Sequence, residues 1–487
     1  MKLETIPVGE YLPDQPPLGN KGALEAKNVI PWKDSYKQLN DLSAYSGNGL
    51  DARCQGGYYA RDVDGNIYNF AGDATKLYKL ETTSFSDVSR TSGGAYATPS
   101  DGDWEFTQWG QTVIAVNGAD AAQLISLSGT AFTALGGSPP IARHIAVVRD
   151  FVVMGNVGST PNRVQWSGID DSASWAVSAT TQADFQDLQG DGGWVAKIIG
   201  GEIGIVFRER DIWRMTYVGS PVIFQFDQIE RQRGTFAPQS VIGYGGIVFY
   251  LADDGFYITN GAGPSAPIGD GKIDRTVLDE LDQNFFFRIT ASIDPTNKLV
   301  MWAYPGTGHS GGTPNRIVIF NWVEKRWAYA EVTLETFVKY ASQGYTLDGL
   351  DSVNASLDAL TPSLDSRVWT GGLVSLAAFD TDHKIGTFTG SALSGVVDTG
   401  EVQHYPGYRS NVTEVRPLVT GGTATVTVGR RNLQSESVTF GSAVSQNASG
   451  TCPVRSNARY HRYRITTSGD FDFVQGVQAI CEQGDMR

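Results

Sequence analysis

The chain has 487 residues, of which 41% are hydrophobic and 18% charged, a composition too apolar for a disordered protein. Its 38 basic and 52 acidic residues give a net charge of -14, which argues against a surface that neutralises nucleic-acid phosphates. No apolar run reaches the roughly 18 residues that a membrane helix needs, and the opening MKLETIPVGEYLPDQPP lacks the apolar core of a secretory signal. We therefore expect a globular protein that folds in the cytoplasm without membrane insertion.

Residues 1–50 contain five prolines and show little alternation of apolar and polar residues. Proline cannot donate a hydrogen bond to a sheet, and the stretch has neither the period of a strand nor that of a helix. The sequence therefore predicts an extended N-terminal arm over residues 1–50.

Residues 51–390 form a series of similar units. Glycines beside Asp, Asn and Ser are typical of turns, and the segments between them are rich in Val, Ile, Tyr, Phe and Trp, as strands are. The stretch GEIGIVFRERDIWRMTYVG, residues 201–219, has an apolar run, a charged break and a second apolar run, which predict a hairpin. Equivalent second strands are predicted to begin at Val113, Phe151, Gly204, Ile247 and Leu299.

These units repeat at intervals of roughly 40 to 55 residues, the period of four-stranded propeller blades. Because one such sheet cannot bury both of its faces alone, radial packing against its neighbours completes the core. We predict an all-β fold in which residues 51–390 form a β-propeller of six or seven blades, with one further unit from Ser366. A stack of β-sandwich domains is the alternative.

Two short segments within this body have helical spacing and are predicted to be inserted helices. KIDRTVLDELDQ places four apolar residues on one face, namely Ile273, Val277, Leu278 and Leu281. DSVNASLDAL, residues 351–360, has the same pattern.

Strict alternation returns after a polar stretch near residues 384–400. In TATVTVG, Ala424, Val426 and Val428 share one face of a strand. Residues 391–487 are therefore predicted to form a small C-terminal β domain resembling a sandwich.

The three cysteines, Cys54, Cys452 and Cys481, show no CxxC spacing and have no histidine cluster beside them in the sequence. Neither a zinc site nor a disulfide framework is indicated. A reducing compartment favours three structural thiols, and a disulfide between Cys452 and Cys481 is the alternative under oxidising conditions.

The motifs of common catalytic and phosphate-binding sites are absent from the sequence. It contains no GxxxxGK[ST], no GxGxxG after a strand, no HExxH and no GxSxG, and only five scattered histidines. We predict no catalytic residues, no cofactor-binding residues, no cofactors and no metal ligands.

Two segments resemble known sites but have a structural interpretation as well. In DVDGN, Asp62, Asp64 and Asn66 would offer oxygens to calcium, but the glycine comes two positions too early for an EF-hand loop, and a hairpin turn explains the same residues. SGIDDSASW approximates the Asp-box turn of sialidase propellers, with one extra residue and Ala173 in place of glycine.

Acidic residues that would serve a glycosidase lie at predicted turns, where they are ordinary. Such an enzyme needs two carboxylates facing each other across a cleft. The candidates, which we expect to be solvated turn residues, are Asp170, Asp171, Glu209, Asp253 and Asp254.

Arginines and tryptophans leave two further alternatives. Arg459, Arg462 and Arg464 in ARYHRYRI would bind an anionic partner or, as we prefer, form a protein interface. The tryptophans would stack on sugars or, as their positions in strands suggest, fill the blade cores; examples are Trp166, Trp175, Trp213, Trp302, Trp322 and Trp327.

The order of several segments resembles that of virion proteins of short-tailed phages, the tail nozzle or tail tubular protein B family. The resemblance rests on VGEYLPDQPPLGNKGALEAKNVIPW, on ARDVDGNIYNFAGDATKLYKL and on the block from RVQWSGIDDSASW to DGFYITNG. It covers most of the chain through about Trp327 and is looser in the C-terminal domain.

The resemblance implies a structural protein of the virion tail that is not an enzyme and assembles in the host cytoplasm. Such a protein forms a ring of six copies below the adaptor ring, extends the channel for DNA exit, and supports fibres or spikes. Its expected partners are further copies of itself, the tail adaptor, tail fibres or spikes, and double-stranded DNA that passes without sequence-specific binding. A propeller glycosidase or sialidase and a surface adhesin are the alternatives.

Overall fold

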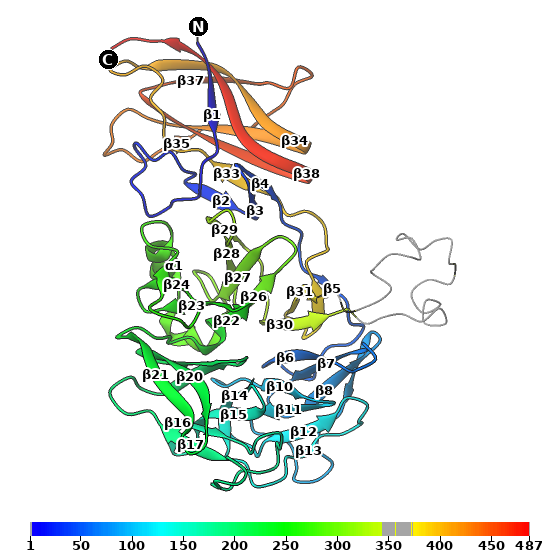
Figure 1. Cartoon of the computed structure of the whole chain (residues 1–487). Helices are drawn as coiled ribbons and strands as arrows, with labels where there is room; N and C mark the ends of the chain where they lie inside the picture. Colours follow the sequence, from blue (N-terminus) through cyan, green and yellow to red (C-terminus); the bar gives the residue numbers. More distant parts are fainter. Residues whose placement is uncertain (1, 343–355, 357–371, 373, 487) are drawn as a thin grey trace.

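Six separate four-stranded antiparallel sheets are the main units of the protein (Figure 1). The computed structural model describes residues 2–342, 356, 372 and 374–486. Strand accounts for 51% of the structure and helix for 4%. The sheets are arranged as the blades of a β-propeller, so the predicted all-β propeller fold is confirmed and the stack of sandwiches is wrong.

Five of these blades are built from consecutive strands. Their strands are β6 (Gly57–Arg61), β7 (Ile67–Gly72), β8 (Leu77–Glu81) and β9 (Ser84–Asp87); β10 (Glu105–Trp109), β11 (Thr112–Val116), β12 (Gln123–Ser126) and β13 (Thr133–Ala134); β14 (Ala142–Val148), β15 (Phe151–Val157), β16 (Thr160–Trp166) and β17 (Asp184–Asp187); β18 (Val195–Ile199), β19 (Gly204–Arg208), β20 (Asp211–Gly219) and β21 (Ile223–Arg231); and β22 (Ile242–Tyr244), β23 (Ile247–Ala252), β24 (Gly255–Thr259) and β25 (Ala266–Pro267).

The sixth separate blade combines strands from both ends of the propeller sequence. Its strands are β30 (Thr336–Ala341), β31 (Val374–Phe379), β32 (Ile385–Thr387) and β5 (Ser43–Ala44). Because β5 precedes every other blade strand in the chain, its pairing with β32 closes the ring. The unit predicted from Ser366 contributes β31; its residues 366–371 and 373 lie outside the described residues.

A seventh four-stranded meander belongs to a larger sheet. It comprises β26 (Thr290–Asp294), β27 (Leu299–Tyr304), β28 (Arg316–Asn321) and β29 (Arg326–Ala330). The outer strand β29 pairs with β2 (Glu25–Lys27), and β2 pairs with β33 (Val396–Asp398). The meander thereby becomes one end of a sheet of fourteen strands.

The β19–β20 hairpin explains the charged break in residues 201–219. Glu209 and Arg210 form the exposed turn, whereas Arg208 and Asp211 on either side of it are buried. Arg208 donates from Nε and Nη2 to the two carboxylate oxygens of Asp211, at 2.6 and 2.5 Å. Two of the four charged residues of the break therefore form a solvated turn, and the other two form a buried ion pair. The predicted second-strand starts are also confirmed, since each lies within one residue of the start of β11, β15, β19, β23 or β27.

The C-terminal residues form two long antiparallel strands, β34 (Ser410–Arg431) and β38 (Tyr460–Gln483). Shorter strands pair with β34: β35 (Thr439–Phe440), β36 (Val444–Ser445) and β37 (Cys452–Ala458). The predicted buried face of TATVTVG is confirmed, since its three apolar residues are at most 6% exposed. One hydrophobic core contains these residues together with those of β27 and β28, so the C-terminal strands are packed onto the propeller.

Residues 1–50 are not the extended arm predicted from their prolines. β1 (Lys2–Pro7) pairs with β38, and β3 (Val29–Trp32) pairs with β4 (Ser35–Gln38). The chain therefore starts and ends in the same sheet, at the same end of the molecule (Figure 1). The prediction failed because the partner of β1 lies at the other end of the sequence, where no local pattern reveals it.

The first predicted helix is confirmed as α1 (Asp274–Glu280), and Ile273, Val277 and Leu281 are buried on one side of it. Two short 3-10 helices also occur, η1 (Pro238–Ser240) and η2 (Gln283–Arg288). The second predicted helix, residues 351–360, lies outside the described residues apart from Ser356. Among the helices that the structure describes, none has the length and apolarity to span a bilayer.

All three cysteines are buried and free. The alternative of a disulfide between Cys452 and Cys481 is therefore not realised, and the interpretation as structural thiols fits their burial.

Candidate functional site

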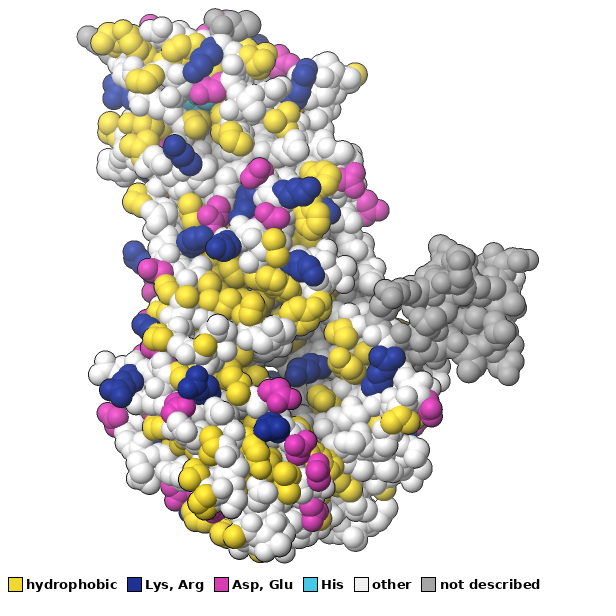
Figure 2. All heavy atoms as spheres, in the orientation of Figure 1, with side chains coloured by type: hydrophobic (Ala, Val, Ile, Leu, Met, Phe, Trp, Pro, Cys, Tyr) yellow, Lys and Arg dark blue, Asp and Glu magenta, His cyan; other side chains and the backbone are white. Residues whose placement is uncertain are grey.

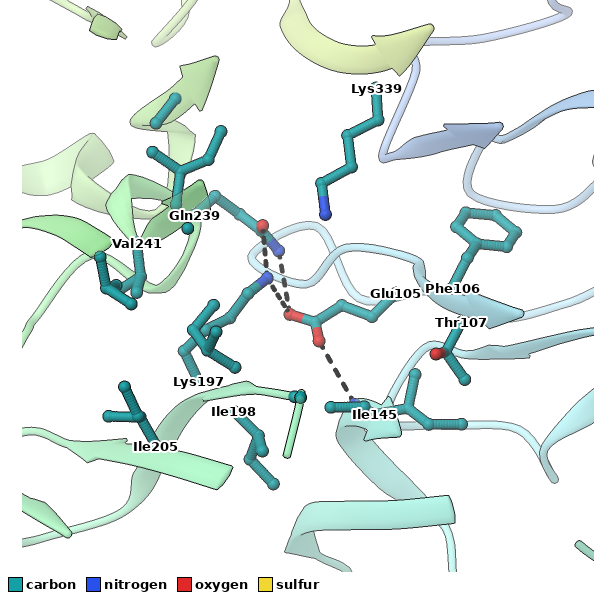
Figure 3. Close-up of a pocket in the computed structure, with 18 of the residues that line it drawn as sticks. Glu105, Phe106, Thr107, Ile145, Lys197, Ile198, Ile205, Gln239, Val241 and Lys339 are labelled. Carbon is teal, nitrogen blue, oxygen red and sulfur yellow. Dashed lines mark hydrogen bonds and ion pairs between the residues drawn. The ribbon is translucent and has the colours of Figure 1, made fainter. Parts of the chain in front are cut away.

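The propeller encloses a central cavity of about 790 Å³. This cavity, called the propeller channel below, is distinct from the channel through which DNA would leave a virion. Its walls come from the first strand of every four-stranded unit, namely β6, β10, β14, β18, β22, β26 and β30. Ile145, Val147 and Ile199 make part of the wall apolar, and a cluster of charged side chains projects into the same space (Figure 3). Seven sheets thus surround one cavity.

Glu105, the first residue of β10, is buried and organises the charged cluster. Its Oε1 accepts a hydrogen bond from Lys197 Nζ at 2.6 Å and from Gln239 Nε2 at 3.3 Å, and it lies 2.9 Å from Nδ1 of His144. Its Oε2 accepts from the Ile145 N–H at 3.3 Å. Figure 3 shows Lys197 and Gln239 converging on this carboxylate. The network links three blades through one side chain.

The surroundings of Glu105 keep it ionised. Burial on its own would raise the pKa of Glu105, but the Lys197 ammonium and the His144 ring outweigh that effect and lower the pKa to about 2. A carboxylate with such a pKa stays ionised near neutral pH. Glu105 therefore acts as a fixed negative charge.

Lys339 of β30 points into the cavity toward the same cluster (Figure 3). Its ammonium makes no ion pair or hydrogen bond with any described residue and lies 6.0 Å from the centre of the Tyr58 ring. Burial lowers the pKa of Lys339, and repulsion from Lys197 lowers it further. Lys339 thus has no direct ion-pair partner among the described residues, and the nearby Glu105 charge only partly opposes the lowering of its pKa.

A second carboxylate, Asp103, and two arginines, Arg53 and Arg288, lie just before the first strands of three units, β10, β6 and β26. Burial raises the pKa of Asp103 to about 6, although Arg53 and Lys197 oppose the shift. Burial lowers the pKa of Arg288 to about 10, with a further contribution from Arg53. The Nη1 atom of Arg288 is buried and has no hydrogen-bond partner among the described residues. Asp103 and Glu105 therefore form a carboxylate pair whose pKa values are shifted in opposite directions.

The residues weighed as a calcium site form a turn between β6 and β7. The Asp62 carboxylate accepts hydrogen bonds from the N–H groups of Asp64 and Asn66 and from the Asn66 side chain, at 2.8 to 3.0 Å. The carboxylate is thus used to fold the turn, as the hairpin interpretation requires.

The Asp-box-like segment is a loop between β16 and β17. The Asp171 carboxylate accepts from the Ala173 N–H at 2.9 Å, and the buried Trp175 ring donates to the Ser172 carbonyl at 2.8 Å. All five acidic glycosidase candidates lie at exposed loop positions away from the channel lining. For these residues the interpretation as solvated turns is the better one.

The basic trio at the start of β38, with Arg459 just before the strand, has partners within the chain. Arg462 donates to Asp398 Oδ2 at 2.6 Å, and Arg464 donates to both oxygens of the same buried carboxylate. Arg459 donates to the Met486 carbonyl at 3.1 Å. Arg462 and Arg464 therefore join β33 to β38 within the chain.

Four of the six tryptophans named above fill hydrophobic cores, as expected. Trp302 and Trp327 are wholly buried, and Trp166 and Trp175 are at most 4% exposed. Trp213 and Trp322 are half-buried beside the cores.

Sequence reasoning missed the channel residues, although a weak signal was present. Glu105, Lys197 and Lys339 all lie in the first strand of a repeat unit, at WEF, AKII and FVKY. A charged residue in the same strand of several units indicates a shared polar interior, because first strands line the axis of a propeller. The five residues that the sequence singled out came from turns instead.

The comparisons with known proteins add no functional information. No family model matches the chain, and no curated protein matches its sequence. Structural similarity extends to the computationally designed Ika8 protein (10% identity, 72% of this chain and 99% of that chain, TM-score 0.38). It also extends to the Pan2 WD40 domain of Neurospora crassa (8%, 74% and 97%, 0.38) and to the extracellular domain of the putative hybrid two-component system BT4673 of B. thetaiotaomicron (9%, 72% and 39%, 0.40). At these TM-scores and identities the three proteins carry no argument about what this chain does.

Proposed function

We propose that this protein is a tail nozzle subunit of a short-tailed phage, a structural protein that forms a ring below the adaptor and extends the channel for DNA exit. The observation that carries the proposal is the continuity of the fold. One fourteen-stranded sheet and one hydrophobic core extend from the propeller into the domain that holds both chain ends. A tube wall needs subunits whose parts do not shift against each other, and a shared sheet and core provide that stiffness. The resemblance in segment order supports the same assignment.

The surface charge supports a wall that lets DNA pass. Figure 2 shows acidic and basic side chains interspersed over one face, without a basic stripe on that face. The net charge of -14 repels a duplex. Each phosphate held by Lys or Arg would slow a sliding genome, so weak contact suits a conduit.

The β20–β21 hairpin is the part of the propeller that we assign to contact between neighbouring copies. Its strands have nine residues each, and Val218 and Val222 beside its turn are 50% and 60% exposed. Two exposed valines at the tip of a long hairpin form an apolar edge that a neighbouring subunit would cover.

Ring assembly tests the proposal. We expect the full-length protein, alone or mixed with the tail adaptor, to form closed rings of six copies in negative-stain images and by mass photometry. The double variant Val218→Asp/Val222→Asp should weaken assembly at least about tenfold, because a carboxylate buried without a partner costs more than 1.4 kcal/mol.

The control variant is Val63→Asp, at a blade turn where the side chain is 83% exposed. It should assemble like the wild-type protein, and all three proteins should share one unfolding midpoint. A protein that stays monomeric with and without the adaptor would overturn the nozzle proposal. Equal loss of assembly in both variants would overturn the role of the hairpin.

One observation favours a second candidate function, a glycosidase with its site at the mouth of the channel. Asp103 and Glu105 have pKa values of about 6 and about 2, and such a split is the mark of an acid and an anionic carboxylate in glycoside hydrolysis. Arg53 and Arg288, which influence the same group of charges, would suit an anionic sugar.

Asp103→Asn separates the two functions. Because burial raises the pKa of Asp103 in the folded state, the charged form destabilises the fold as pH rises through about 6. We therefore expect the variant to be more stable than the wild-type protein at pH 7 and equally stable below about pH 4, measured by urea unfolding.

Against a panel of sialosides and neutral glycosides the nozzle proposal expects no turnover by either protein, whereas hydrolysis by the wild type that Asp103→Asn abolishes would establish the enzyme.

A further inference from the structure

A cluster of metal-binding side chains joins the two ends of the chain, far from the propeller channel. Glu4 of β1, His404 and Cys481 of β38 each offer a ligand atom, and the three atoms lie within 4.8 Å of one another. His404 and Cys481 are buried, and Glu4 is partly exposed. Strand pairing brings β1 next to β38, with Lys2 opposite Cys481, so the fold itself assembles the group.

Hydrogen bonds around His404 orient its ring in the way that metal ligands require. Nδ1 of His404 lies 2.8 Å from Oε2 of Glu4, and Nε2 lies 2.6 Å from the hydroxyl of the buried Tyr463. A histidine that binds a metal through one nitrogen commonly bonds an outer partner through the other. Tyr463 occupies that outer position.

His461 supplies an independent observation. It is wholly buried, yet its Nε2 atom has no hydrogen-bond partner among the described residues. Its other nitrogen lies 3.3 Å from the Ser410 hydroxyl. The ring centroids of His461 and His404 are 5.4 Å apart, but neither nitrogen of His461 belongs to the group of ligand atoms within 4.8 Å of one another. His461 would therefore have to turn toward that group to complete a tetrahedral zinc site.

We propose that the C-terminal domain binds one zinc ion through Glu4, His404 and Cys481, with His461 turning in as the fourth ligand. The donor set of one thiolate, one carboxylate and two imidazoles suits Zn²⁺ better than Ca²⁺ or Mg²⁺, which prefer oxygen ligands. Two negative ligands would neutralise the divalent ion. The Lys2 ammonium lies 3.2 Å from Oε2 of Glu4, so zinc would displace it from that carboxylate.

Zinc binding must also balance in protons. Cys481 loses its thiol proton to solvent when it becomes a thiolate ligand. Binding at Nδ1 of the neutral His404 ring leaves the single ring proton on Nε2, next to Tyr463, so one proton is released per zinc bound.

The zinc would fasten β1 to the strand that ends the chain. It would add to the antiparallel pairing that already holds β1 against β38, and it assigns a role to histidines that are otherwise buried side by side. The sequence predicted no metal ligands because residues 4, 404, 461 and 481 share no spacing that a motif detects.

The test uses untagged full-length protein stripped with a chelator and then titrated with zinc or cobalt. We expect one equivalent of tight binding, a higher thermal unfolding midpoint, and, with cobalt, the visible bands of tetrahedral coordination plus thiolate charge transfer. Cys481→Ser should abolish the charge-transfer band and weaken zinc binding by more than the roughly 10- to 100-fold that loss of an outer partner costs. His461→Ala should lower the intensity of the tetrahedral bands.

Cys452→Ser is the matched control, because Cys452 is also buried in this domain but is not a member of the cluster. It should bind zinc and cobalt like the wild-type protein. Glu4→Gln, at a partly exposed position, provides a ligand variant that is expected to fold, as judged by its metal-free circular dichroism. Absence of stoichiometric binding by the wild type would overturn the site, and so would equal zinc affinity in Cys481→Ser and Cys452→Ser. An unchanged cobalt spectrum in His461→Ala would overturn the assignment of the fourth ligand.

Discussion

Trp302→Ala is expected to lower the free energy of unfolding by about 3 to 5 kcal/mol, the usual cost of removing a wholly buried tryptophan. The ring lies in β27 and packs against Phe256 and Trp327, with centroids 4.7 and 6.1 Å away. Its Nε1 donates to the Ser240 carbonyl at 2.9 Å. The substitution therefore leaves a cavity and an unpaired buried carbonyl together. Urea unfolding followed by near-ultraviolet circular dichroism measures the effect.

The position of Trp302 makes the effect reach beyond one blade. The same hydrophobic core includes residues of β24, α1 and the C-terminal strands, so a cavity there loosens the packing between propeller and C-terminal domain. Trp194→Ala is the control, because its ring is 55% exposed and the change should stay within about 0.5 kcal/mol. Equal unfolding midpoints for the two variants would contradict the structural role of Trp302.

The local elements of the fold could be predicted because their signals are short in sequence. The second strands of five units, helix α1 and the buried face of β34 follow from apolar spacing and turn residues within about a dozen positions. The pairings of β1 with β38 and of β5 with β32 could not be predicted. They join opposite ends of the chain, and the short strands involved carry no pattern that selects a distant partner.

The candidate site was harder to predict than the fold because its residues look ordinary in sequence. Charged side chains are usually solvated, so Asp170 and Glu209 at turns attracted attention while Glu105 and Lys197 within strands did not. The same reasoning fails for Arg208 and Asp211. Their position beside a turn predicts that they are exposed to solvent, but in the structure they form a buried ion pair. Burial of a charge depends on the partner that tertiary structure supplies, and a single sequence does not name that partner.

Glu105→Gln is expected to destabilise the protein by on the order of 3 kcal/mol at pH 7. The pKa of Glu105 is lowered to about 2 in the folded state from an ordinary value of 4.5, and about 2.5 pKa units correspond to roughly 3 kcal/mol. Glutamine keeps the shape of the side chain but removes the charge that Lys197 and His144 face.

The sign of the pH dependence follows from the direction of the shift. A carboxyl whose folded pKa is lowered stabilises the fold above its unfolded pKa, and that contribution is lost as pH falls through the folded pKa. The stability gap between wild type and Glu105→Gln should therefore be constant above about pH 5 and close between about pH 5 and pH 2. Urea titrations at several pH values, compared between the two proteins, cancel the contributions of all other carboxyls.

Removing both charges distinguishes a lost attraction from a cavity or a distorted strand. Single removal is costly because it leaves the Lys197 ammonium, 14% exposed, without its partner, whereas replacement of a whole buried pair is often close to neutral. Glu105→Gln/Lys197→Met should therefore recover most of the stability lost by Glu105→Gln. Glu202→Gln removes a carboxylate that is 91% exposed and 3.7 Å from Arg149, and it should change stability by less than about 1 kcal/mol. If the double variant were as unstable as the single one, packing around Glu105 rather than its charge would hold the blades together.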